Sequence, residues 1–138
     1  MKKIILAFLF LFCVQNFCIA NVKIDVLKIY DGDSILARID DNVFRIRLIG
    51  IDCFEGTESS RAKWQAREKE LSLEEIVKGG NIAKDILSAK LKNKEVYFEF
   101  AGIDKYSRAL GNLYVEKSNI NNEMLKTPYC YVYMPKGN

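Results

Sequence analysis

Hydrophobic and polar residues alternate between Val22 and Ile49, which is the period of β-strands with one buried face. The predicted strands cover residues 22–30, 34–39 and 43–49. Asp31-Gly32 and Asp40-Asp41-Asn42 separate these strands, and both are strong turn signals. Because tight turns join neighbouring antiparallel strands, this part of the chain is predicted to form a three-stranded meander.

The centre of the chain has a helical period instead. Ser60 is predicted to cap a helix over residues 60–71, and a capping box begins at Ser72. Apolar residues then recur at helical spacing over residues 82–91. The pair Gly79-Gly80 predicts a break or a kink in this second helical stretch.

Strand character returns in the last third of the chain. The predicted elements there are a strand over residues 95–100, a loop over 102–106, a strand over 109–115, a short helix over 121–125 and an extended segment over 129–133. Five strands with a helical insertion favour a mainly β, α+β fold, namely a five-stranded OB-type barrel. At 138 residues the chain has room for one such domain.

The first twenty residues differ from the rest. Lys2-Lys3 precede an unbroken apolar run from Ile4 to Val14, and the small residue Ala20 ends the segment. This pattern is typical of a secretory signal peptide over residues 1–20, because the apolar run is too short to span a bilayer. An uncleaved anchor or a buried N-terminal helix is the alternative, although the run has no polar face. We therefore expect an exported protein, periplasmic or secreted, with no stable membrane anchor and a domain over residues 21–138.

Composition removes several classes of chemistry. The chain has no histidine, which excludes Ser-His-Asp and Cys-His nucleophiles and zinc sites built on histidine. The predicted leader carries two of the 21 basic residues and none of the 18 acidic ones, so a net charge of about +1 remains. Nucleic-acid binders often have a strong basic excess. Any phosphate binding here must therefore depend on the local placement of Arg and Lys.

Two cysteines remain beyond the leader, Cys53 and Cys130. An even number of cysteines in an oxidising compartment is compatible with a disulfide, and both residues lie near predicted strand ends. Two free thiols are the alternative, and the sequence does not decide between them.

Two polar segments lie where a predicted strand begins. In Asp31-Gly32-Asp33-Ser34, Asp33 stands at a strand start and could aim its carboxylate at a hard cation, although most Asp-Gly turns only reverse the chain. The segment from Asp104 to Arg108 is rich in hydrogen-bond donors and leads into the strand at Ala109. Its alternative interpretation is an ordinary charged hairpin.

A third polar segment follows the strand over residues 43–49. Arg45 and Arg47 share one face of that strand, and Asp52 and Glu55 come just after its end, where loops commonly hold sites. A solvated face suffices as an explanation for Arg45, and a surface ion pair is the alternative for the acids. Acids beside phosphate-binding cations make little sense in a pure binding module. They make sense if a divalent cation lies between the carboxylates and a phosphate.

Taken together and in this order, the segments resemble the staphylococcal nuclease (thermonuclease) family. The resemblance rests on Asp31-Gly32-Asp33-Ser34, on Arg47-Leu48-Ile49-Gly50-Ile51-Asp52-Cys53-Phe54-Glu55 and on Asp104-Lys105-Tyr106-Ser107-Arg108-Ala109-Leu110. It covers residues 21–133. It implies an OB-fold phosphodiesterase that depends on calcium and acts on DNA and RNA.

The resemblance also implies a role for individual residues. The implied calcium ligands are Asp33, Asp52 and the backbone carbonyl of Cys53, with Asp31 holding the ion through water. The implied catalytic residues are Arg47 and Arg108, which clamp the scissile phosphate, and Glu55, which acts as a general base or positions the attacking water. The implied contacts to a neighbouring phosphate are Lys105 and Tyr106.

The chain departs from the family pattern at several points. Phe54 stands where the family usually has proline, which predicts a less constrained loop, and Ser107 stands in a turn where the family usually has glycine. The C-terminal helix of the family is expected to be missing. The candidates for a contact to a base, in competing registers, are Tyr129, Tyr131 and Tyr133.

The sequence therefore predicts an exported, monomeric, calcium-dependent nuclease for DNA and RNA, with single strands preferred. This function is favoured because every acid and arginine of the implied site is present. The alternative is a catalytically weak or inactive nuclease-like OB module that binds single-stranded nucleic acid or a protein partner. The near-neutral charge and the altered loop at Phe54 support that alternative.

Overall fold

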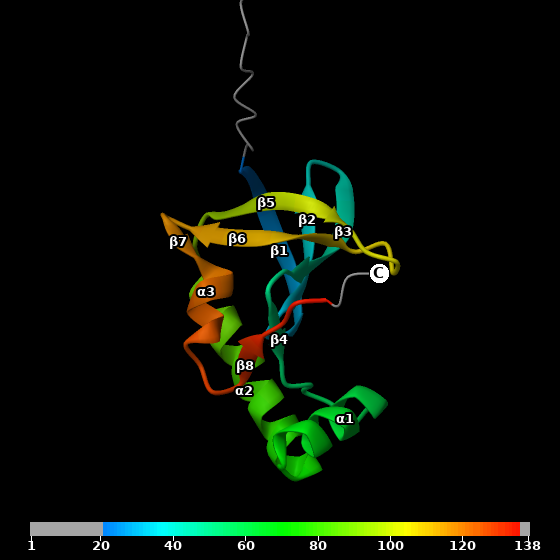
Figure 1. Cartoon of the computed structure of the whole chain (residues 1–138). Helices are drawn as coiled ribbons and strands as arrows, with labels where there is room; N and C mark the ends of the chain where they lie inside the picture. Colours follow the sequence, from blue (N-terminus) through cyan, green and yellow to red (C-terminus); the bar gives the residue numbers. More distant parts are fainter. Residues whose placement is uncertain (1–20, 136–138) are drawn as a thin grey trace, which may run out of the picture.

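The computed structural model describes residues 21–135, so the predicted leader over residues 1–20 lies outside the described residues (Figure 1). The strands are β1 (Val22–Asp31), β2 (Ser34–Ile39), β3 (Asn42–Leu48), β4 (Ile51–Cys53), β5 (Val96–Ile103), β6 (Ala109–Val115), β7 (Ser118–Asn119) and β8 (Cys130–Val132). The helices are α1 (Ser60–Lys69), α2 (Leu73–Leu91) and α3 (Ile120–Leu125).

Five of the strands form a closed barrel (Figure 1). β1, β2 and β3 pair antiparallel as the predicted meander, β5 pairs with β1, and β6 pairs with β5. A parallel pairing between β3 and β6 closes the barrel. The predicted OB-type barrel with a helical insertion is therefore confirmed.

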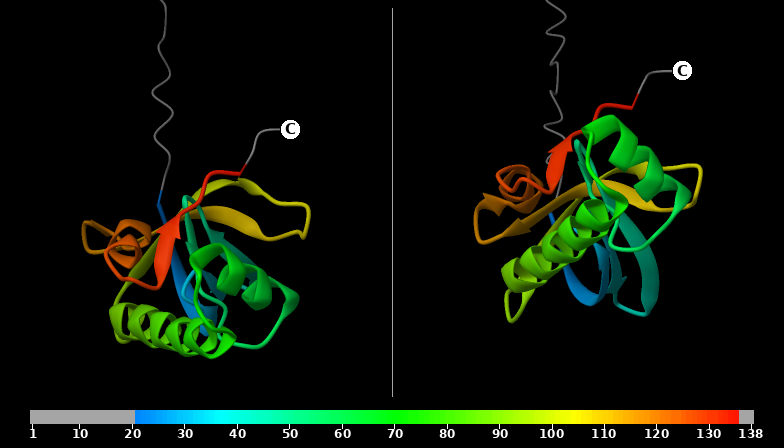
Figure 2. Two further views of the ribbon diagram at one scale, coloured as in Figure 1. Left: turned by 60° about the horizontal axis from the view of Figure 1, so that its bottom comes forward. Right: turned by 90° about the horizontal axis from the view of Figure 1, so that it is seen from below.

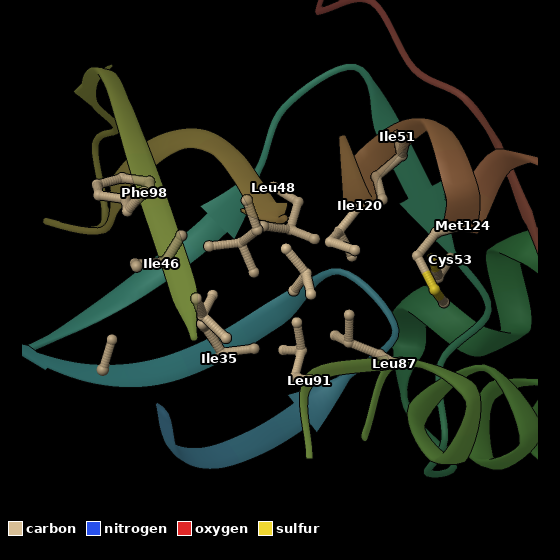
Figure 3. Close-up of a cluster of buried hydrophobic side chains, with 14 of the residues drawn as sticks. Ile35, Ile46, Leu48, Ile51, Cys53, Leu87, Leu91, Phe98, Ile120 and Met124 are labelled. Atoms are coloured by element: carbon tan, nitrogen blue, oxygen red, sulfur yellow. The ribbon is translucent and has the colours of Figure 1, made fainter. Parts of the chain in front are cut away.

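The core fills the barrel and continues under α2. The alternation along β2 and β3 turns Ile35, Ile46 and Leu48 inward, where they face Leu87 and Leu91 of α2 (Figure 3). Burying each of these aliphatic side chains contributes roughly 1.5–3 kcal/mol. The hydrophobic face of α2 thus seals one end of the barrel, and Figure 2 shows the helix lying across that end.

The predicted break at Gly79-Gly80 is wrong, because α2 is continuous through both glycines. Both are buried against the loop that follows β4. A Cβ atom on Gly79 would lie 2.8 Å from the Phe54 ring, and one on Gly80 would collide with the Glu55 carbonyl group. The glycines therefore permit close packing of the helix against the Phe54–Glu55 segment, at a cost of about 1 kcal/mol each in helix propensity.

The ends of the helices follow local capping rules. Ser59, rather than the predicted Ser60, is the N-cap of α1, since its backbone is extended and its hydroxyl accepts the N–H of Ala62 at 3.0 Å. The predicted capping box between Ser72 and Glu75 is confirmed. In residues 21–135, no helix is long and apolar enough to cross a bilayer.

A second, two-stranded sheet joins β4 to β8. The sequence pattern predicted a loop after residue 49 and missed β4, because all three of its residues are buried and show no alternation. Cys53 pairs with Cys130 across this sheet, and the two form a disulfide with an S–S distance of 2.05 Å. Of the two alternatives that the sequence left open for the cysteines, the structure has the disulfide. The extended segment predicted near the end of the chain is confirmed as β8.

Candidate active site

A cavity of about 620 Å³ opens where the β1–β2 turn, the end of β3, β4 and the β5–β6 loop meet. The predicted site residues that line it are Asp31, Asp33, Arg47, Asp52, Glu55, Lys105, Tyr106 and Arg108. Cys53 is not among the residues that line the cavity, and its carbonyl accepts a hydrogen bond from Gln65. Three segments far apart in the sequence thus meet at one cavity.

Asp33 follows the tight turn at Gly32 and is buried at the base of the cavity. Its Oδ2 accepts the backbone N–H of Cys53 at 2.7 Å and lies 3.5 Å from the Arg47 guanidinium. Burial raises the pKa of Asp33 to about 6, although Arg47 and the hydrogen bond from Cys53 oppose the rise. The position of the carboxylate is therefore set by both β3 and β4.

Arg47 is held by the chain around it. Its Nη1 donates to the carbonyls of Leu48 and Ile51 at 2.7 and 2.9 Å, and its Nη2 donates to Asp52 Oδ1 at 3.0 Å. Asp52 is only 2% exposed. A guanidinium bonded at several points in a partly buried place has a fixed orientation, which suits a group that binds phosphate.

The second oxygen of Asp52 accepts hydrogen bonds from the Arg61 guanidinium and the Tyr131 hydroxyl. The Arg61 Nε also lies 3.8 Å from Glu55 Oε1. Burial and the bond to Asp52 raise the pKa of Tyr131 above its usual range, which keeps the hydroxyl protonated as a donor. The sequence patterns did not predict Arg61 as a site residue, and they indicated Tyr131 only as a candidate contact to a base. The place of Arg61 in the first turn of the helix that follows the acidic loop was the one feature of the sequence that could have indicated its role in the site.

Gln65 of α1 organises the loop between the two site acids. The side chain is fully buried, and its Oε1 accepts the backbone N–H of Glu55 at 2.9 Å. Its Nε2 donates to the Cys53 carbonyl at 2.9 Å and to the Tyr131 hydroxyl oxygen at 3.3 Å. Figure 2 shows α1 beside β8 in both views, which is the arrangement that these contacts require.

Glu55 faces the cavity from this loop. Burial raises its pKa to about 7, the negative charges of Asp31 and Asp33 add to the rise, and Arg61 opposes it. A carboxyl group that titrates near neutral pH is suited to proton transfer. A raised pKa is also expected for an acid that lies beside other carboxylates, because their negative charges repel one another. A bound cation would relieve this repulsion.

The donor set matches a hard cation in its chemistry. Carboxylate oxygens of Asp31, Asp33 and Asp52 line the cavity, and hard divalent cations prefer such ligands. In residues 21–135, no three carboxylates converge closely enough to enclose a cation alone. Backbone carbonyl groups and water would have to complete the shell, and Gln65 already uses one acceptor position of the Cys53 carbonyl.

The loop from Asp104 to Arg108 presents Arg108 to the cavity. Asp104 Oδ1 accepts the N–H groups of Tyr106 and Arg108 at 2.9 and 3.0 Å, and its Oδ2 accepts from Arg108 Nε at 2.8 Å. Ser107 makes the turn with a left-handed φ of 59°, the conformation for which glycine is favoured. The turn therefore forms without glycine, at a cost of about 1–2 kcal/mol.

Phe54 anchors the loop that carries Glu55. Its ring is buried in a small cluster with Ile76 and Ala62. The centre of the ring lies 6.3 Å from the centre of the Tyr131 ring. The sequence predicted a less constrained loop at this position. Side-chain packing instead supplies the constraint that proline would supply through the backbone.

Comparison with known proteins identifies relatives of the whole domain. An uncharacterised endonuclease of Escherichia coli O157:H7 is 28% identical, and the match covers 96% of this chain and 74% of the relative. For an uncharacterised endonuclease of Haemophilus influenzae, the identity is 29% and the coverages are 96% and 65%. An uncharacterised protein of Methanocaldococcus jannaschii is 28% identical, and the chain spans only 58% of its length.

The family comparison covers the later strands of the barrel and most of the residues that line the cavity. The model of the family described as staphylococcal nuclease homologue matches residues 45–138, a range that begins at β3 and contains Arg47, the acidic loop, both long helices and the Asp104–Arg108 loop. The match spans two thirds of the sequence and contains two of the three polar segments of the resemblance, while Asp31–Ser34 precedes it. The chain belongs to the staphylococcal nuclease family.

Proposed function

We propose that this protein is an exported, calcium-dependent nuclease that hydrolyses phosphodiester bonds of DNA and RNA and prefers single strands. The observation that carries the proposal is the meeting of Arg47, Arg108 and Glu55 with buried aspartates at one open cavity. Membership of a nuclease family and the endonuclease names of the bacterial relatives support it.

The two arginines would bind the scissile phosphate. Asp104 engages only the Nε of Arg108, which leaves its terminal nitrogens for phosphate oxygens. Arg47 lies on β3, which pairs with β6 just after the Asp104–Arg108 loop, so the two guanidinium groups belong to neighbouring elements and can contact different oxygens of one phosphate. Preorganised donors of this kind stabilise the charge that develops in the transition state, and each is typically worth about 10²–10³-fold in rate.

Glu55 would act on the attacking water, either as its general base or by orienting it. A carboxylate can do this without histidine, and its pKa of about 7 suits proton transfer near neutral pH. Gln65 sets the backbone at Glu55, and Arg61 lies close to its carboxylate. General bases of this kind typically contribute about 10²–10⁴-fold.

The calcium ion would be held by Asp33 and Asp52, with Asp31 acting through water. The Cys53 carbonyl would join them through its second acceptor position, because Gln65 occupies the first. When bound, the ion supplies positive charge to the phosphate oxygens. Arg47 and the Tyr131 hydroxyl each bond one oxygen of Asp52, which gives this ligand a fixed direction.

The test is hydrolysis of single-stranded DNA, duplex DNA and RNA, each with calcium and with a chelator. We expect calcium-dependent cleavage, fastest on single strands, and loss of cleavage in Glu55→Gln. Binding of single strands without cleavage at any calcium concentration would favour the inactive binding module instead. Activity that persists in chelator would contradict the role of calcium.

Export is proposed from residues 1–20, and the disulfide between Cys53 and Cys130 supports it, because such bonds persist in oxidising compartments. N-terminal sequencing of the protein from its own cell should begin at Asn21. A cytosolic protein that still begins at Met1 would contradict the proposal. Size-exclusion chromatography with light scattering tests the proposed monomer.

A further inference from the structure

Arg45 differs from the other arginines of the cavity. Arg47, Arg61 and Arg108 each form an ion pair with an aspartate. Among residues 21–135, the Arg45 guanidinium has no carboxylate within ion-pair distance, although it lines the same cavity. Its charge is therefore available to an anion.

Arg45 is nevertheless held in place. Its guanidinium lies over the Tyr30 ring, 4.3 Å from the ring centre, and the Lys28 ammonium lies 4.9 Å from the same centre. The strand register explains the grouping, because Lys28 on β1 and Arg45 on β3 both align with Leu36 on β2. Aromatic stacking of this kind orients a cation without neutralising it.

Arg45 also lies on the same strand as Arg47, one of the two arginines proposed to bind the scissile phosphate. Arg45 and Arg47 are two residues apart on β3, so they share one face of the strand, and their Cα atoms are about 7 Å apart. This separation is comparable to the distance between successive phosphates of an extended polynucleotide. A chain whose scissile phosphate contacts Arg47 would bring its next phosphate towards Arg45.

We propose that Arg45, stacked on Tyr30 and assisted by Lys28, binds a backbone phosphate beside the scissile one and guides a single strand along the outer face of β1–β3 into the cavity. This inference rests on the proposed nuclease function. Since the partners are cations that recognise phosphate, the subsite contributes affinity and no base preference. A guanidinium that lies over an aromatic ring retains its N–H groups for bidentate contact with a phosphate.

The experiment compares two substrates that differ in whether a second phosphate exists. One is a short single-stranded DNA oligonucleotide, and the other is bis(p-nitrophenyl) phosphate, which has a single diester. Arg45→Gln should lower kcat/KM on the oligonucleotide roughly tenfold and leave the small diester unchanged. The salt dependence of oligonucleotide binding, measured in chelator, should become shallower by about 0.7 in its logarithmic slope.

Arg38→Gln is the matched control. Arg38 is an exposed arginine on β2 that pairs with Asp25 at 3.0 Å and does not line the cavity, so its loss removes the same charge elsewhere. Lys28→Gln and Tyr30→Leu should each produce a smaller version of the Arg45→Gln effect. Circular dichroism of each variant confirms that the barrel is intact.

The outcomes separate the two proposals. If Arg45→Gln behaves like Arg38→Gln on the oligonucleotide while wild type cleaves it, the subsite is overturned and the nuclease function stands. If Arg45→Gln lowers kcat/KM equally on both substrates, Arg45 acts at the scissile phosphate and the subsite is again overturned. If wild type neither binds nor cleaves the oligonucleotide, both proposals fail.

Discussion

The backbone N–H of Glu55 donates a hydrogen bond to the fully buried side chain of Gln65, with 2.9 Å between the nitrogen and Oε1. The same side chain donates to the Cys53 carbonyl at 2.9 Å. One residue of α1 therefore holds both ends of the short segment between the metal-ligand candidate Asp52 and the base candidate Glu55. The helical insertion is part of the site and not only a cover for the barrel.

Replacement of the Gln65 side chain should show whether it positions Glu55 in addition to stabilising the fold. Gln65→Met keeps the volume but leaves the Glu55 N–H and the Cys53 carbonyl without partners, which costs about 1–3 kcal/mol for each group. We expect lower stability in urea and, in the fraction that stays folded, a fall in kcat larger than the rise in KM. Lys63→Met, on the exposed side of α1, is the control. An unchanged kcat in folded Gln65→Met would show that Glu55 does not need this support.

In the absence of metal, the free energy of unfolding should fall as the pH rises from about 4 to about 7. Asp33 and Glu55 have pKa values of about 6 and about 7 in the folded chain, above the ordinary values of 3.8 and 4.5. The folded state therefore binds more protons between about pH 4 and 7, and the stability present below this range is lost as the pH rises through it. For Asp33 the change is at most about 3 kcal/mol.

The measurement is urea unfolding in chelator at a series of pH values. Asp33→Asn and Glu55→Gln should each flatten the curve, because the variant side chains do not titrate. Glu68→Gln, exposed on α1, should leave it unchanged. Stability that rises between pH 5 and about 7 would contradict the predicted direction.

The Cys53–Cys130 disulfide should support both the fold and the site. The bond closes a segment of 77 residues and ties β4, which carries Asp52, to β8, which carries Tyr131. The double variant Cys53→Ser/Cys130→Ser should lose about 3–5 kcal/mol in the chain-entropy view. Non-reducing intact mass and urea unfolding of both forms test this. A mass that matches two free thiols in the exported protein would refute the bond.

Arg61 should compete with a cation for Asp52. The guanidinium bonds Asp52 directly, and its side chain is 42% exposed, so it can leave when a metal binds. Arg61→Gln should therefore tighten calcium binding, up to roughly fivefold, because a competing positive charge is removed. Isothermal titration calorimetry measures the change, with Arg67→Gln on the same helix as the control. Weaker binding in Arg61→Gln would mean that Arg61 instead orients Asp52 for the ion.

Much of the fold followed from local patterns in the sequence. The alternation over residues 22–49 predicted β1 to β3, because a strand with one buried face must alternate, and the capping box at Ser72 predicted the start of α2. The spacing of Arg47, Asp52 and Glu55 and the loop ending at Arg108 predicted the family and the residues that line the cavity. These signals depend on neighbours within a few positions along the chain.

Tertiary structure alone decided the contacts that complete the site. Arg61 and Tyr131 reach the same oxygen of Asp52 although Tyr131 lies 79 positions further along the chain. Gly79-Gly80 reads locally as a helix break, yet the glycines lie within α2 because the loop at Glu55 packs against them. A side chain such as Gln65 shows no local sign of its partners, since its burial depends on how α1 packs against β4 and β8. Packing between distant segments set these contacts, because close approach and full hydrogen bonding are satisfied only when the whole domain is assembled.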